Sequence, residues 1–181
     1  MAVIHDTTMD PTKLELLARW LPGQAWFPGP AEGLARAGGF RLDDPAGEVG
    51  IELMVVTDGS GQAYLVPMTY RGAPLAGADD ALIGTSEHGV LGTRWIYDGE
   101  HDPVLLDQLA ALLRGEVAAQ AQSQSNTEDP TVVVEAAAAV ASVQLARRLE
   151  ADAPPPARGY VMVPWRRPDG ASARGVVATA G

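Results

Sequence analysis

The element that most constrains the fold of this chain is a predicted β-hairpin over residues 49–70. Two apolar runs, Val49–Thr57 and Gln62–Tyr70, flank the turn Asp58-Gly-Ser-Gly61, and such an arrangement is typical of antiparallel strands. Pro67 in the second run has no backbone N–H, so this strand is expected to lie at a sheet edge or to carry a bulge. The chain is therefore expected to build on an antiparallel sheet.

Further strands and two helices complete the predicted fold. A helix is expected after Asp10 or Thr12 as cap, and a second from Pro103 to about Arg114 with a leucine stripe. The other predicted strands are 38–44, 93–97 and a closing hairpin of 160–165 and 175–179. Thr131–Glu135 favours a strand and the alanine-rich run to Glu150 favours a helix, so this segment stays open. The predicted class is α+β, a curved antiparallel sheet with a few helices packed on one side.

Chain length and composition predict one main domain. We expect it to span residues 1–117, followed by a polar linker at 118–130 rich in Gln, Ser, Asn and acids. Residues 131–181 are expected to form a C-terminal extension whose strands pack on the same domain. A chain of 181 residues has room for one such core and for no second catalytic domain.

The net charge and the amino-acid composition argue against several classes of protein function. A formal net charge of −10, with Lys13 the single lysine, argues against nucleic-acid and acidic-membrane partners. The chain has no cysteine, which removes disulfides, thiolate zinc sites and cysteine nucleophiles. No secretory signal and no apolar stretch of membrane-spanning length is visible. A cytoplasmic protein is expected.

Residues 69–103 contain many side chains of the types that bind ligands or take part in catalysis. Charged, imidazole and aromatic residues stand here among several glycines, and segments of this kind often bind ligands or partners. The candidate ligand- or partner-binding residues are Arg71, His88, Arg94, Trp95, Asp98, His101 and Asp102.

No complete catalytic motif can be assembled from these residues. Gly84-Thr-Ser-Glu-His88 resembles a nucleophile elbow, but His88 replaces its second glycine, so a polar turn is expected. The acids and histidines have no recognised metal-ligand spacing, and no cofactor, metal or catalytic residue is expected. Arg71 and Arg94 are able to hold an anion, or to pair with nearby acids and fix the loop.

Several blocks of the sequence resemble one family. Trp20–Gly29 (WLPGQAWFPG), 65–75 (LVPMTYRGAPL) and 81–104 (ALIGTSEHGVLGTRWIYDGEHDPV) resemble the N-terminal cap of bacterial maltokinases. More closely, they resemble the stand-alone proteins classed as maltokinase N-terminal cap-like domains. The resemblance covers about residues 12–115. It implies a cystatin-like cap, in which a curved antiparallel sheet cradles a helix.

The resemblance also sets the expected function. In maltokinases the cap sits on a kinase fold that phosphorylates maltose with ATP, and the lobe that carries the catalytic and metal-binding aspartates is not expected in this chain. Gln124–Thr127 resembles the kinases' phosphate loop and Val143–Glu150 their lysine strand, but Gln144 stands in place of the lysine. No phosphotransfer is therefore expected.

The chain is accordingly expected to be a non-catalytic, cap-like binding or regulatory protein of cytoplasmic α-glucan metabolism. Its expected partner is an enzyme of that metabolism or a second copy of the chain, docked through the 71–103 loop. The alternative is a protein that binds a sugar or sugar phosphate, or a minor enzyme, using the same loop.

Overall fold

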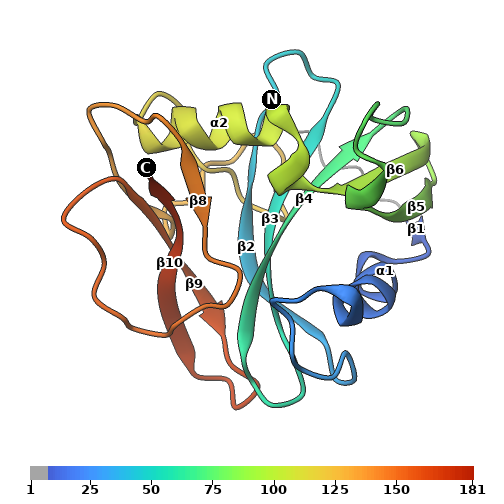
Figure 1. Ribbon diagram of the computed structural model, residues 1–181, viewed down its shortest axis with the longest axis horizontal. Coiled ribbons are helices and arrows are strands. Elements are labelled where there is room, and N and C mark those ends of the chain that lie inside the picture. Colours follow the sequence, from blue (N-terminus) through green and yellow to red (C-terminus); the bar gives the residue numbers. More distant parts are fainter. Residues whose placement is uncertain (1–7) are drawn as a thin grey trace.

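A computed structural model of the protein describes residues 8–181. In this part of the chain, ten strands form one antiparallel sheet in the order β1-β5-β6-β4-β3-β2-β9-β10-β8, and β7 pairs with β9 (Figure 1). The strands are β1 (Met9–Asp10), β2 (Ala35–Leu42), β3 (Gly50–Thr57), β4 (Ala63–Arg71), β5 (Leu82–His88), β6 (Gly92–Asp98), β7 (Val133–Glu135), β8 (Val143–Leu145), β9 (Tyr160–Arg166) and β10 (Ser172–Ala180). The helices are α1 (Lys13–Trp20) and α2 (Pro103–Leu113), with 3₁₀ turns η1 (Leu21–Gly23), η2 (Asp79–Ala81) and η3 (Gly99–His101). The α+β class and the antiparallel sheet are confirmed.

The predicted hairpin forms the centre of the sheet as β3 and β4, which pair without a break from Gly50–Tyr70 to Thr57–Ala63. The expectation that Pro67 marks an edge or a bulge is wrong, since β4 lies between β3 and β6. The Leu65 N–H bonds the Arg147 carbonyl on the side of β4 away from β3. Residues 65 and 67 are two apart in the same strand, so their backbone nitrogens face the same side of β4. The nitrogen of Pro67 therefore faces away from β3, and its lack of an N–H removes no hydrogen bond to β3. On the side that it faces, β6 pairs with β4 only from Met68 onward.

The two helices pack on opposite faces of the sheet, which corrects the prediction that they share one side. Leu53 and Val55 of β3 face a core that includes the leucines of α2. Met54 and Val56, the alternating positions, face a second core with Leu17 of α1. β3 is buried on both faces, and for this reason its sequence is a continuous apolar run.

Local hydrogen bonds fix where each helix begins. Thr12 and Glu15 form a capping box at α1, in which each side chain accepts from the backbone N–H of the other residue. Asp102 caps α2 by accepting from the Val104 N–H, and Pro103 occupies the first helical turn. The two predicted helices are confirmed, and Thr12 is the cap of the first.

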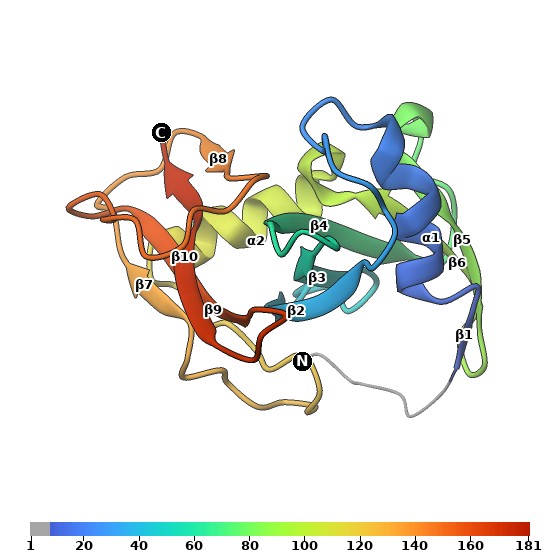
Figure 2. The same cartoon turned by 90° about the horizontal axis from the view of Figure 1, so that it is seen from below.

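The last part of the chain completes the core that α2 covers. The predicted closing hairpin is present as β9 and β10. Residues 131–150 contain the short strands β7 and β8 and no helix, so the strand expected at 131–135 is present and the helix favoured by the alanine-rich run is not. After β8 the backbone forms hydrogen bonds to two different strands. The Ala146 N–H donates to the Val177 carbonyl in β10, and the Leu149 N–H donates to the Ala63 carbonyl in β4. The sheet thus curls around its core (Figure 2).

Polar residues 118–130 also bond to the sheet. Gln120 exchanges backbone hydrogen bonds with Arg41. Gln122 accepts from the Arg36 guanidinium and donates to Glu52 at 2.9 Å. The proposed division of the chain at residues 117 and 130 stays a prediction.

Candidate functional site

The predicted 71–103 loop is mostly regular structure, built by the hairpin of β5 and β6. Gly84–His88 belongs to β5, so the polar turn expected there is wrong. A register shift between Leu82 and Gly84 breaks the alternation of buried and exposed positions, which hides the strand in the sequence. The buried Ser86 hydroxyl donates to the Pro11 carbonyl at 2.7 Å, a contact that ties β5 to the start of α1.

Arg71 and Asp102 form a forked ion pair. The guanidinium donates from Nε and Nη2 to the two carboxylate oxygens, at 2.7 Å each. The Asp102 carboxylate is fully buried and also accepts from the Thr69 hydroxyl at 2.7 Å. Burial alone raises the pKa of Asp102, but the hydrogen bonds from Arg71, Thr69 and the Val104 N–H outweigh it and hold the pKa below its usual value. These two candidate residues therefore anchor the start of α2.

Asp98 has a partner from the far end of the chain. Nη2 of Arg147 lies 2.7 Å from both Asp98 carboxylate oxygens and 2.6 Å from Glu100. The same guanidinium lies over the Trp26 ring, 4.8 Å from its centroid. Arg147 thus joins the segment after β8 to the end of β6 and to the tryptophan-rich segment after α1.

His88 and Arg94 stabilise the β5–β6 turn. Nδ1 of His88 accepts from the backbone N–H groups of Val90 and Leu91, at 3.3 and 3.1 Å. Arg94 donates to the Leu91 carbonyl at 2.6 Å. Both side chains hold the backbone of the hairpin tip.

Trp95 and His101 lie apart from these pairs. Trp95 is half-buried and packs on a small cluster formed by Ala78, Ala81 and Tyr97. His101 is exposed at the end of η3. The seven candidate residues thus fall into separate places: the Arg71–Asp102 pair, the Asp98–Arg147 pair, the hairpin turn, and these two single side chains. The structure does not bring them together as one constellation.

The β5–β6 tip carries an exposed apolar pair. Val90 is 62% exposed and Leu91 44% exposed, and the third large hydrophobic residue exposed within residues 8–181 is Val117 at 38%. Val90 and Leu91 are adjacent on a turn that His88 and Arg94 hold in shape. Sequence reasoning placed the candidate site in this segment but missed these two side chains, because isolated apolar residues carry no chemical signal.

A buried polar cluster around Glu52 was also missed. Glu52 accepts from Lys13 at 2.6 Å and from the Tyr70 hydroxyl at 2.6 Å, in addition to Gln122. Burial alone raises the pKa of Glu52, but the Lys13 charge and these hydrogen bonds outweigh it and lower the pKa. Burial and the Glu52 charge raise the pKa of Tyr70 well above its usual value. The cluster ties the start of α1 and the 118–130 segment to β3 and β4.

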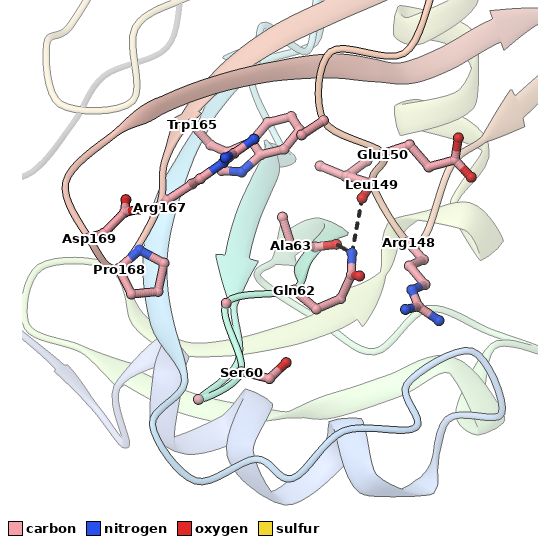
Figure 3. A pocket seen from close by; sticks show the side chains of 13 residues that line it. Ser60, Gln62, Ala63, Arg148, Leu149, Glu150, Trp165, Arg167, Pro168 and Asp169 are labelled. Atoms are coloured by element: carbon pink, nitrogen blue, oxygen red, sulfur yellow. Dashed lines mark hydrogen bonds between the residues drawn. The ribbon is translucent and has the colours of Figure 1, made fainter.

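A polar pocket lies away from the predicted site. It has a volume of about 750 Å³ between the β3–β4 turn, residues 148–151 and the β9–β10 turn (Figure 3). Its charged side chains are Arg148, Glu150, Arg167 and Asp169. Three segments distant in sequence build it, so only the fold could reveal it.

Neither a metal-binding cluster nor a membrane-spanning helix is found within residues 8–181. No group of three or more His, Asp or Glu side chains in this range is arranged to hold a metal ion. No helix in the same range has both the length and the apolar character that crossing a membrane requires.

Comparison with protein-family models relates part of the chain to a known domain. Residues 20–102 match the maltokinase N-terminal cap domain, which confirms the family that the sequence blocks resemble. No curated protein matches the chain. The matched segment begins at Trp20, the last residue of α1, contains β2–β6, and ends at the α2 cap Asp102. Residues 20–102 are therefore similar to the maltokinase N-terminal cap domain.

Proposed function

We propose that the protein is a non-catalytic, cap-like module of cytoplasmic α-glucan metabolism that docks on a partner enzyme through the β5–β6 hairpin. The observation that carries this proposal is the exposed Val90–Leu91 pair on a turn fixed by His88 and Arg94. The hairpin lies in the segment that matches the maltokinase N-terminal cap domain. The resemblance to that cap implies a module that sits on a second domain.

The ion pairs of this region support a binding role over catalysis. The Asp102 carboxylate accepts hydrogen bonds from Arg71, Thr69 and the Val104 N–H. The Asp98 carboxylate is buried against Arg147. Acids with this many internal partners hold a fold together, whereas a general acid or base must reach a substrate. The alternative of a sugar-binding protein or minor enzyme using residues 71–103 has less support for the same reason.

Charge selects the kind of partner. The net charge of −10 favours a partner whose contact face is basic at its rim and apolar at its centre. Rim charges then speed the encounter, while burial of Val90 and Leu91 supplies affinity. Among the partners expected from the sequence, an enzyme with such a face is preferred to a second, equally acidic copy of this chain.

We further propose that the cap-like region, about residues 12–115, is cystatin-like. The packing of α1 against the curved strands β3–β6 supports this, since Leu16, Leu17 and Leu21 share one core with Met54, Val66 and Ile96.

The test measures binding of the full chain to purified enzymes of α-glucan metabolism, including a maltokinase and a glucan branching enzyme. The perturbed protein carries Val90→Ser and Leu91→Ser, and the matched control carries Val117→Ser. Full burial of Val or Leu is worth about 1.5–3 kcal/mol, and both side chains are roughly half exposed, so we expect a loss of about 2 kcal/mol, or about 30-fold in Kd.

The control should bind like the unmodified chain. Equal affinity in the double variant would contradict docking through the hairpin. A chain that binds none of these enzymes would contradict the proposed function itself.

A further inference from the structure

We propose that His88 makes the β5–β6 turn pH-sensitive, so that the turn holds Val90 and Leu91 in their docking shape at neutral pH and releases them when the imidazole becomes charged. This inference rests on the proposed docking through the hairpin and concerns how that docking is regulated. The turn belongs to the chain alone, so its behaviour can be measured both with and without a partner.

The His88 imidazole holds the turn through one atom. Nδ1 accepts from the backbone N–H groups of Val90 and Leu91, at 3.3 and 3.1 Å. A ring nitrogen accepts a hydrogen bond only while it carries no proton, so the neutral form with its proton on Nε2 is the form that closes the turn. Both bonds reach the backbone of the two apolar residues that the hairpin exposes.

Protonation of the imidazole removes both bonds together. The charged ring carries a proton on each nitrogen, so Nδ1 becomes a donor that faces two other donors. An unperturbed imidazole takes up this proton at about pH 6.5, where a small change in pH alters its charge. Two ordinary hydrogen bonds correspond to about 30-fold in the equilibrium between the closed and the open turn.

The face of the hairpin that carries His88 also carries a cation. His88 pairs with Gly92, and Ser86 pairs with Arg94, so the side chains of Ser86, His88 and Arg94 line one face. Arg94 donates to the Leu91 carbonyl of the same turn at 2.6 Å. Protonation of His88 therefore adds a second positive charge on the face that carries Arg94.

The acids of the neighbouring strands lie on the other face of the hairpin. β1 pairs with β5 through Met9–His88 and Asp10–Glu87 (Figure 2). The cross-strand neighbour of His88 in β1 is thus an apolar residue, and Asp10 shares the opposite face with Glu87. The Glu87 carboxylate accepts from the Thr93 hydroxyl of β6 at 2.6 Å.

α1 also packs on β5, and its charged side chains are Lys13, Glu15 and Arg19. Lys13 is bound to Glu52, and Glu15 is bound to its capping partner Thr12. Histidine is the side chain whose charge ordinarily changes near neutral pH, and His88 is the histidine of β1, α1, β5 and β6. The hairpin therefore responds to pH in this range through His88.

The first test follows the turn without a partner. In NMR spectra of the full chain between about pH 8 and about pH 5, the amide shifts of Val90 and Leu91 should move together with the ring signals of His88. His88→Asn supplies an acceptor oxygen that does not titrate, so in this variant the two amide shifts should stay constant. The proposal is overturned if the two amides do not follow His88, or if they move equally in His88→Asn.

The second test measures binding of the full chain to a purified maltokinase and a glucan branching enzyme at about pH 7.5 and about pH 5.5. We expect the unmodified chain to bind at least about 5-fold more weakly at the lower pH, the equivalent of one of the two hydrogen bonds. His88→Asn should bind equally at both pH values, and His88→Ala, which has no acceptor, should bind weakly at both. His101→Asn removes an exposed histidine outside the hairpin and should keep the pH dependence.

Comparison of the variants on one enzyme separates the titration of His88 from that of the enzyme itself. Equal pH dependence in the unmodified chain and in His88→Asn would overturn the regulation and leave docking intact. If neither enzyme binds at about pH 7.5, the proposed docking fails, and the amide titration alone then decides whether His88 controls the turn.

Discussion

Replacing Asp102 by alanine should destabilise the fold by about 4 kcal/mol. Removing one partner of a buried ion pair costs about 3–5 kcal/mol, because the remaining charge stays desolvated. Losing the helix cap on the Val104 N–H adds about 1 kcal/mol. Arg71 is 19% exposed and can recover some hydration, which keeps the estimate within this range.

The reverse change, Arg71→Ala, tests the same pair from its other side. It leaves the fully buried Asp102 carboxylate without its guanidinium, so a loss of similar size is expected. Asp102→Asn keeps an acceptor for the Val104 N–H and should fall between the alanine variant and the unmodified chain.

Urea unfolding followed by far-UV circular dichroism measures these changes as shifts in the midpoint at constant slope. A total stability of about 5–15 kcal/mol leaves the variants measurable at low temperature. If Asp102→Ala and Arg71→Ala each cost less than about 1 kcal/mol, the pair does not anchor α2. Arg71 would then be available for a ligand, and the case for a non-catalytic hairpin region would weaken.

Two further predictions concern the other buried pairs. The pKa of Glu52 is lowered in the folded chain, so its ionised carboxylate stabilises the fold fully above about pH 5, and this stabilisation is lost as pH falls through the folded pKa. Glu52→Gln should therefore make the unfolding free energy fall less steeply as the pH is lowered below about 5. An unchanged slope would contradict the assignment. Arg147→Met should cost about 3 kcal/mol and change the tryptophan emission of Trp26, whereas Arg148→Met, a neighbouring exposed change, should do neither. Equal unfolding midpoints in the two methionine variants would count against the Asp98 pairing.

Much of the fold could be predicted because it is encoded locally. The β3–β4 hairpin, the cap at Thr12 and the β9–β10 hairpin each depend on residues close in sequence. The placement of Pro67 could not be predicted in this way. It depends on which segments flank β4, and one of them is residues 147–149, far along the chain.

The candidate site was harder to predict for the same physical reason. A polar side chain looks available in the sequence until its partner is known, and Asp98 finds its partner 49 residues away in Arg147. The apolar tip at Val90 and Leu91 has no chemical motif. The sequence indicated the segment that we propose for docking, but neither its strand structure nor the side chains that it exposes.

The bonds that residues 146–149 make to β4 and β10 bear on how fast the chain folds. Ala63 meets Leu149, and Gln62 meets the Leu149 carbonyl, 87 residues away. The core under α2 also needs Val161, Val163 and Val177 from the last strands. Folding rates fall as the mean sequence separation of contacts rises, because long loops must close before their contacts form. During synthesis, the face of β3 and β4 under α2 is therefore completed only when nearly the whole chain is present, and it stays exposed to other proteins until then.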